Sequence, residues 1–303
     1  MELNKFENLL NRLEITWEKK EIRKNNNIIL TGYQIGTKKI KPCIYEDTIK
    51  KNDEISLVKM IEEIINGLEN TDFVFTKENV QLKVYPAVRS RKLNEEDKET
   101  VTMPVENFDD LEMYFYIKLE QKELKALGIV NTEEDGTATV TIHKGLLKEI
   151  GLNPEELYAY ADINMNRDLR IKSILQALTE TIENENEIPF DTEEKSIVEA
   201  ADEIIYIATN PTKIKGAGVI ASKLCMEKIK EFAKKKEWGS FAILPSSIHE
   251  VLIVKMEGID DKETYDNMVK EVNRDVVEKR DILEEHSYIF IYDRFEKDYM
   301  TLS

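Results

Sequence analysis

A nucleophile, a base and an orienting acid are candidates within the stretch ILPSSIHEVLIV (residues 243–254), at Ser246, Ser247, His249 and Glu250. Such a set could perform acyl transfer if a serine stood on a sharp GxSxG turn beside an oxyanion hole. Leu244 and Ile248 occupy the two glycine positions around Ser246, so the GxSxG pattern is absent. The sequence therefore predicts no catalytic residue here. It favours a turn whose serine hydroxyls bond to nearby backbone groups.

The apolar runs on either side of this turn predict the elements that position it. SFAIL (240–244) and EVLIV (250–254) can each form a strand, and Pro245 between them favours a hairpin connection. The run Val251–Val254 is apolar on both faces, which is typical of a central strand covered on both sides. His249 would then open the second strand. A ligand-binding role would belong to the four residues Ser246, Ser247, His249 and Glu250 together.

Two arginines just after a predicted strand are the other candidates for binding. Arg89 and Arg91, in YPAVRSRK, could each bind a carboxylate or a phosphate bidentately. They could equally pair with the acidic residues that outnumber them, and pairing is the favoured interpretation. Lys234 to Lys236 suit the end of a helix, where cations meet the negative end of the helix dipole.

No metal or cofactor site is predicted. The three histidines are far apart and form no HxxxH pair, while Cys43 and Cys225 lack metal-ligand spacing. The chain contains no Walker-type GxxxxGK and no GxGxxG after a strand. The phrase NPTKIKGAG, residues 210–218, is interpreted as a plain turn because no helix is predicted to begin there to hold a phosphate.

Composition limits the class of protein. With 303 residues and 41% hydrophobic content, the chain can bury a substantial core in one or two domains. Its formal net charge of -17 argues against general binding to nucleic-acid phosphates. It has no apolar run of membrane-spanning length and no signal-like N-terminal segment. We therefore expect a soluble, cytoplasmic protein.

Hydrophobic periodicity predicts an α+β fold of mostly antiparallel mixed sheets with flanking helices. NPEE at 153–156 predicts a helix start, and a further helix is expected over residues 168–182. EIIYIATN, a turn, a strand AGVIAS and the helix KLCMEKIKEFAKK follow the same order as MYFYIKLE, a turn, TVTIH and KGLLKEIG. A diverged internal duplication of a strand–strand–helix unit is therefore a hypothesis.

Three units are expected along the chain. Residues 1–72 read as a helix–meander–helix module, residues 73–184 as a first α+β unit, and residues 195–303 as a second. The acidic segment 185–194 contains Pro189 and has little apolar periodicity, which predicts a linker or an exposed loop.

Several phrases carry a resemblance. ILPSSIHEVLIV, with IYIATNPTKIKGAGVIAS before it and MVKEVNRDVV and YIFIYD after it, resembles a family of uncharacterised proteins of Gram-positive bacteria. That family is often found on mobile and conjugative elements. VYPAVRS and LLKEIGL resemble the YtpQ family, which also has no assigned function. Together the similarities run from about Gln81 to Tyr292, and they imply one evolutionary unit without implying an activity.

The favoured hypothesis is a non-catalytic binding protein with a protein partner, in a mobile-element or host-defence setting. A second hypothesis is an enzyme whose site assembles from dispersed residues, with His249, Glu250 and Arg89 as candidates. A third is an acidic mimic of nucleic acid that inhibits a host nuclease. Against mimicry, 43 lysines and arginines are interspersed with 60 acidic residues, which is typical of an ordinary solvated surface.

Overall fold

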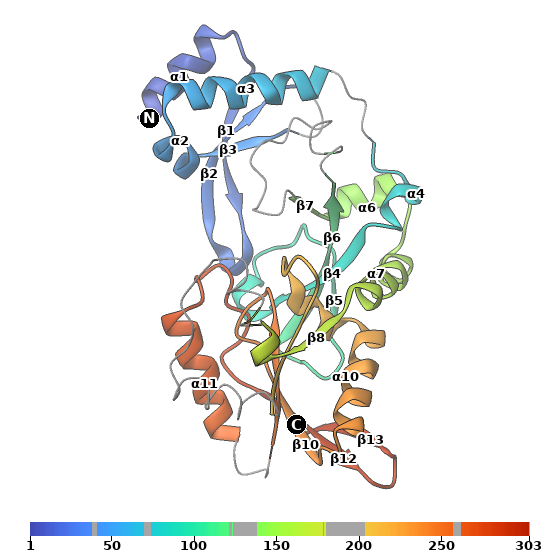
Figure 1. The fold of residues 1–303 in the computed structure, drawn as a ribbon. Helices are drawn as coiled ribbons and strands as arrows, with labels where there is room; N and C mark the ends of the chain where they lie inside the picture. The colour runs from blue at the N-terminus through green and yellow to red at the C-terminus, as the bar shows by residue number, and fades with distance from the viewer. Residues whose placement is uncertain are drawn as a thin grey trace.

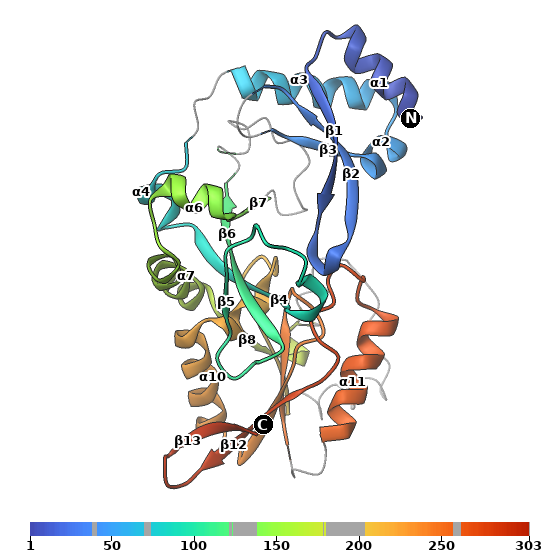
Figure 2. The same ribbon diagram turned by 180° about the vertical axis from the view of Figure 1, so that it is seen from behind.

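The computed structural model describes residues 1–37, 41–69, 74–120, 123, 138–177, 179, 204–256 and 262–302. Three antiparallel sheets are flanked by helices, which confirms the expected α+β class (Figure 1). No helix within these ranges is both long and apolar enough to cross a membrane. Figures 1 and 2 show a smaller N-terminal part beside a larger part that holds most of the sheet structure.

Residues 1–69, here called the N-terminal module, have a core of their own. Its elements are α1 (Leu3–Arg12), β1 (Trp17–Arg23), the 3-10 helix η1 (Asn25–Asn27), β2 (Ile29–Ile35), β3 (Cys43–Tyr45), α2 (Glu46–Lys51) and α3 (Glu54–Glu69). The apolar face of α1 packs on the sheet, where the Phe6 ring meets the Tyr33 ring edge-on at 5.2 Å. The β1–β2 hairpin reaches from this core to the rest of the chain (Figure 1).

The remaining described residues, here called the body, begin with a four-stranded sheet. Its elements are α4 (Lys77–Val80), β4 (Val84–Ser90), the 3-10 helix η2 (Lys92–Asn94), β5 (Thr102–Pro104), β6 (Leu111–Leu119), β7 (Ala138–Thr141), α6 (Lys144–Ile150) and α7 (Pro154–Asp168). β6 is central: it pairs with β4 on one side and with β5 and β7 on the other. α7 begins where the sequence predicts, because Asn153 and Glu156 form a reciprocal capping box.

A six-stranded sheet completes the body. Its elements are β8 (Arg170–Ser173), β9 (Ile205–Thr209), the 3-10 helix η3 (Gly216–Ala221), α10 (Lys223–Lys235), β10 (Ser240–Leu244), β11 (Val251–Lys255), α11 (Lys262–Asp275), β12 (Tyr288–Asp293) and β13 (Asp298–Leu302). The strand order is β13-β12-β10-β11-β9-β8, so β10 and β11 are central. Val254 faces the side where α11 packs, and Val251 and Ile253 face the side of α10. The expected central strand with both faces covered is confirmed.

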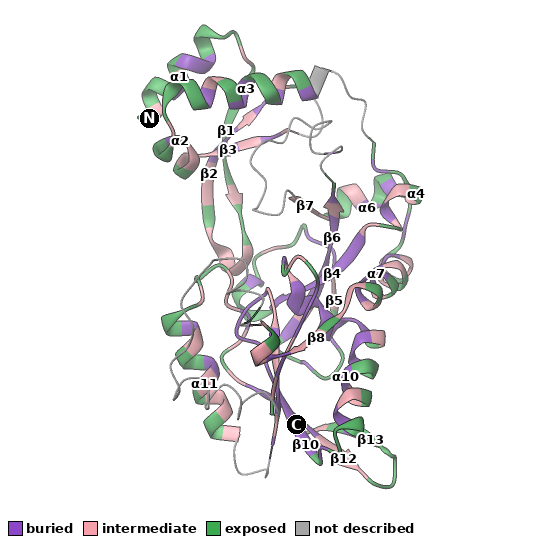
Figure 3. Ribbon diagram, viewed as in Figure 1, coloured by how far each residue is buried: buried purple, intermediate pink, exposed green. Residues whose placement is uncertain are grey.

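The two sheets of the body share one hydrophobic core (Figure 3). Phe108, before β6, packs its ring 4.6 Å from that of Tyr288 in β12. The backbone of η3 lies directly on β4, because a Cβ atom on Gly218 would come within 2.1 Å of the Pro86 carbonyl oxygen. Only glycine allows this close approach.

Two predicted elements are wrong. Residues 170–173 form strand β8 and not the expected helix, because Ile171 pairs with Ala208 of β9 and sheet pairing overrides the helical spacing of the local apolar residues. The expected strand AGVIAS is the 3-10 helix η3, so the strand–strand–helix order is not repeated there. The acidic segment 185–194, and the predicted helix beyond residue 179, lie outside the described residues.

Candidate functional site

The stretch 245–250 is the connection between β10 and β11, as predicted. The two strands pair antiparallel from Phe241↔Lys255 to Leu244↔Leu252. The second strand begins at Val251, so His249 lies in the connection and does not open the strand as expected. The connection is held by a second segment of the chain, residues 281–284, and is therefore wider than a tight turn.

Ser246 and Ser247 are buried under that second segment, with 9% of each residue exposed. The carbonyl oxygen of Ser246 accepts a hydrogen bond from the Leu283 amide, and Ser247 forms a β-bridge with Ile282. The Ser247 hydroxyl accepts a hydrogen bond from the backbone amide of His249 at 3.1 Å, which is the backbone role that the sequence predicts. The two serines hold the connection in place.

His249 is half-buried beside an acid from the same second segment. Its Nδ1 lies 3.3 Å from the Lys213 carbonyl oxygen, and its Nε2 lies 3.7 Å from Asp281 Oδ1. Both ring nitrogens therefore face oxygen acceptors. A general base needs a ring nitrogen whose lone pair faces the proton of a nucleophile. The acid beside the ring is Asp281, whereas Glu250 is the acid that the sequence suggested.

Arg89 is buried, with 5% of the residue exposed, and is paired with acids as the favoured interpretation predicts. Its Nε and NH2 atoms each lie 2.8 Å from Glu112 Oε1, and its NH1 lies 2.7 Å from Asp97 Oδ2. Glu112 stands directly opposite Arg89 in the β4–β6 register. Arg89 thus joins the sheet to the loop that carries Asp97, and its charge is already matched.

Asp97 is the most strongly perturbed acid of this region. Burial would raise the pKa of its carboxyl group, but this is outweighed by the hydrogen bonds from Arg89, from the Thr100 hydroxyl and from the Thr100 amide. The result is a pKa well below the usual range of an aspartate. The Thr100 hydroxyl donates to Asp97 Oδ2 at 2.7 Å. Asp97 is therefore a fixed anion at neutral pH.

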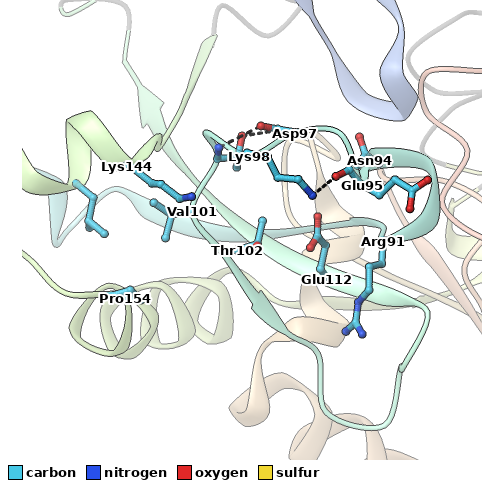
Figure 4. A pocket seen from close by; sticks show the side chains of 12 residues that line it. Arg91, Asn94, Glu95, Asp97, Lys98, Val101, Thr102, Glu112, Lys144 and Pro154 are labelled. Atoms are coloured by element: carbon cyan, nitrogen blue, oxygen red, sulfur yellow. Dashed lines mark hydrogen bonds between the residues drawn. The ribbon is translucent and has the colours of Figure 1, made fainter.

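A surface hollow of about 440 Å³, here called the Arg91 pocket, lies over this ion cluster (Figure 4). It is lined by Arg91, Asn94, Glu95, Asp97, Lys98, Thr100, Val101, Thr102, Glu112, Lys144, Leu147 and Pro154. Lys144 enters from the start of α6 and Arg91 from the end of β4, with Lys98 between them (Figure 4). All three cationic residues are exposed.

Some of the charged groups of the pocket are in ion pairs, and others are not. Asp97 and Glu112 are engaged with Arg89 beneath the pocket. Arg91 NH2 donates to the Leu111 carbonyl oxygen at 3.2 Å, and Lys98 Nζ donates to the Glu95 carbonyl oxygen. Across the described ranges, none of Arg91, Lys98 and Lys144 is in an ion pair with a carboxylate. Glu95 adds a third carboxylate to the lining, so with Arg89 beneath it the pocket holds four cations and three carboxylates and has a small excess of positive charge.

The structure brings some of the predicted residues together and separates others. The Arg89 guanidinium lies 5.5 Å from the centre of the Tyr114 ring. Burial raises the pKa of Tyr114, while the charge of Arg89 lowers it and that of Asp281 raises it by smaller amounts. Arg91 faces the pocket instead. Sequence reasoning missed Lys98 and Lys144, because nothing in their local pattern shows that the loop before β5 meets the start of α6.

Neither cysteine has reactive character. Burial raises the pKa of the Cys43 thiol to about 11 and that of the Cys225 thiol to about 12. Both groups are therefore protonated thiols and weak nucleophiles at neutral pH. Within the part of the chain that the structure describes, no three histidine, cysteine, aspartate or glutamate side chains are grouped closely enough to hold a metal ion.

Comparison with known proteins gives one finding on ancestry and none on activity. Residues 3–294 match the model of a family described as "Family of unknown function (DUF5688)". No curated protein matches the chain, and no solved structure matches it.

Proposed function

Because this chain belongs to the family of unknown function DUF5688, we propose a function from its own site: it acts by non-catalytic binding of a protein partner. The partner contributes an acidic, extended segment, which lies in the Arg91 pocket. The resemblance to a family often found on mobile elements suggests a partner in a mobile-element or host-defence setting.

The observation that carries this proposal is that the cations lining the pocket are not in ion pairs, whereas two of its acids are paired with Arg89. Within the described ranges Arg91, Lys98 and Lys144 line one hollow without forming ion pairs, while two of its three acids are held by Arg89. In a chain with a net charge of -17, a pocket with three cations and one acid, Glu95, outside ion pairs favours an anionic ligand. A hollow of about 440 Å³ is in the size range of pockets that hold small ligands or short peptide segments.

The shape of the pocket supports an extended segment. One wall is the strand β5, which contributes Thr102 and, just before it, Val101. The other wall is formed by α6 and the start of α7, with Leu147 and Pro154 as apolar contacts. A peptide lying between them would place carboxylates near the cations and apolar atoms near Leu147.

The candidate catalytic groups support binding over chemistry. Both His249 ring nitrogens face acceptors, the two serines are buried, and Arg89 is matched by two carboxylates. Each of these groups has a stabilising role that explains its position. The enzyme hypothesis at His249 therefore ranks below binding.

A defined acidic peptide tests the proposal. Binding of fluorescein-labelled hexaglutamate is measured by fluorescence polarisation at low salt and again at high salt. The triple variant Arg91→Gln, Lys98→Gln, Lys144→Gln should bind about tenfold or more weakly, because each cation of an ion pair in a pocket contributes on the order of 1 kcal/mol.

A second triple variant is the matched control. Lys20→Gln, Lys51→Gln, Lys59→Gln removes the same charge from exposed positions of the N-terminal module. It should bind within about twofold of the wild type, since distant surface charges are screened. Equal weakening in both variants would show that only net charge matters and would overturn the pocket.

A pulldown from a host lysate separates this proposal from mimicry. An acidic mimic would recover a nucleic-acid enzyme at low salt with wild-type chain and pocket variant alike. A partner that is recovered by the wild type and the control variant, and is lost with the pocket variant, favours the Arg91 pocket.

A further inference from the structure

The tip of the β1–β2 hairpin consists of three asparagines with an unusual backbone. Asn26 and Asn27 both have a φ of 55°, in the left-handed region. Asparagine is one of the few residues other than glycine that adopts this conformation at low cost. The tip extends away from the core of the N-terminal module and meets the body (Figures 1 and 2).

At the tip, Asn26 and Asn94 form a reciprocal pair of hydrogen bonds. The Asn26 backbone amide donates to Asn94 Oδ1 at 2.9 Å, and Asn94 Nδ2 donates to Asn26 Oδ1 at 3.2 Å. Asn94 is only 2% exposed, and its Nδ2 also donates to the Ser90 carbonyl oxygen at 2.8 Å. Asn94 lines the Arg91 pocket, so the hairpin tip touches the pocket wall from behind.

The same tip also grips the segment that covers the two buried serines. Asn26 Nδ2 donates to the carbonyl oxygens of Lys279 at 2.9 Å and Ile282 at 2.7 Å, and Asn25 Nδ2 donates to that of Arg280 at 2.7 Å. Beside it, Arg23 forms an exposed ion pair with Glu96 at 2.7 Å. The tip is thus bonded both to the pocket wall and to the segment 279–282, so the second set of bonds holds the tip in place against the wall.

We propose that the N-terminal module is part of the binding site, and that Asn26 is a positioning residue that holds the wall carrying Arg91 and Lys98 through its paired bonds with Asn94. This inference rests on the proposed function of the Arg91 pocket. Its ligand is the same acidic segment, whose carboxylates need the two cations at a fixed separation.

The remaining bonds of the wall explain why Asn26 positions it without being needed for folding. Asp97, at the far end of the wall, is tied to Arg89, and the Arg91 amide donates to the Asp110 carbonyl oxygen at 2.9 Å. Both ends of the wall therefore stay attached when the contact with Asn26 is lost. Removing the Asn26 side chain takes away the bond from Asn94 Nδ2 in the middle of this segment, while the Asn26 backbone amide still donates to Asn94 Oδ1 and Arg23 still pairs with Glu96.

Two neighbouring glycine substitutions make a matched test. Asn26→Gly and Asn27→Gly each remove an amide side chain at a φ of 55°, which glycine tolerates. The Asn27 side chain accepts a bond from Arg23 within its own hairpin, whereas the Asn26 side chain bonds to the body. We expect Asn26→Gly to weaken hexaglutamate binding about five- to tenfold, and Asn27→Gly to change it by less than about twofold.

A variant at Asn94, on the other side of the contact, completes a double-mutant cycle. Asn94→Ala should weaken binding by a similar factor, and the double variant Asn26→Gly, Asn94→Ala should bind no more weakly than the weaker single variant. A purely structural role would lower the melting temperature without changing the affinity of the folded fraction. Equal affinities for wild type and Asn26→Gly would overturn the inference.

Hydrogen exchange tests the inference without the peptide. Amides of residues 92–98 should exchange faster in Asn26→Gly than in Asn27→Gly, and peptide bound to the wild type should slow exchange at residues 24–28, since coupling is reciprocal. If the wild type binds no hexaglutamate, the proposed function fails, and unchanged exchange at residues 92–98 would separately refute the role of Asn26.

Discussion

Replacing Arg89 with methionine should be among the most destabilising single changes in the body. Methionine keeps much of the buried volume but leaves the carboxylates of Asp97 and Glu112 without their cation. Removing one partner of a buried ion pair costs about 3–5 kcal/mol, because a charge is left uncompensated. Asp97 keeps its bonds from Thr100, so we expect a loss at the lower end, roughly 3 kcal/mol.

The stability lost in Arg89→Met should depend on pH. In the wild type the depressed pKa of Asp97 contributes stability above the unfolded-state pKa of about 4, and this contribution is lost as pH falls. In Arg89→Met, the arginine no longer offsets the effect of burial on the pKa of Asp97. Protonation of Asp97 then removes an uncompensated buried charge from the folded state. The stability difference between wild type and variant should therefore shrink as pH is lowered from about 7 to about 4.

Urea denaturation followed by tryptophan fluorescence measures both effects. The chain has two tryptophans: Trp17 lies in the N-terminal module and Trp238 is buried in the core of the body. In a Trp17→Phe background the signal reports the body alone. Arg274→Met is the control, because Arg274 and its partner Asp275 are exposed and screened by solvent, so this change should leave the urea midpoint nearly unchanged. A loss below about 1 kcal/mol for Arg89→Met, or a difference that does not change with pH, would refute the reasoning.

Three further outcomes are expected. In a denaturation assay, Gly218→Ala should cost more than about 3 kcal/mol of stability or prevent folding, because the new Cβ would meet the Pro86 carbonyl oxygen at 2.1 Å. The control Gly145→Ala, in open space on α6, should be neutral or stabilise by up to about 1 kcal/mol. The pKa of His286 is raised, chiefly by its hydrogen bond to Glu284. The stability that His286 contributes is therefore present below about pH 6.5 and is lost as pH rises through its folded-state pKa. In His286→Gln, the thermal unfolding midpoint should change less with pH over that range. His249→Ala should lower stability by about 1 kcal/mol and leave hexaglutamate affinity within about twofold, and a large loss of affinity would return His249 to the binding site.

Elements with strong local signals could be predicted from the sequence. α7 begins at Pro154 after the Asn153 cap, and α10 covers the predicted helix from Lys223 to Lys235, because capping and apolar spacing are local properties. η3 could not be predicted, because its backbone is set by distant contacts. A Cβ on Gly216 would come within 2.2 Å of the His249 carbonyl oxygen, far along the chain.

The candidate site divides in the same way. That Arg89 pairs with acids follows from composition, but the identity of Glu112 depends on the register of β4 against β6, which no local pattern specifies. The acid beside His249 is Asp281, which belongs to another segment, and not the neighbouring Glu250. The Arg91 pocket needs Lys98 and Lys144 to meet across two elements, so it emerges only from the packed structure.

The separation of the two cores has a consequence for the order of events during protein synthesis. The core of the N-terminal module uses buried residues from Phe6 to Ile64, whereas that of the body extends from Phe75 to Tyr299. On the ribosome the first can close early, since domains fold as they emerge, while the second waits for nearly the whole chain. The bonds from Asn26 to the segment 279–282 cannot form until that segment has been made. This second attachment of the tip is therefore a late step, and a chain arrested before that segment would carry an asparagine tip that lacks these bonds.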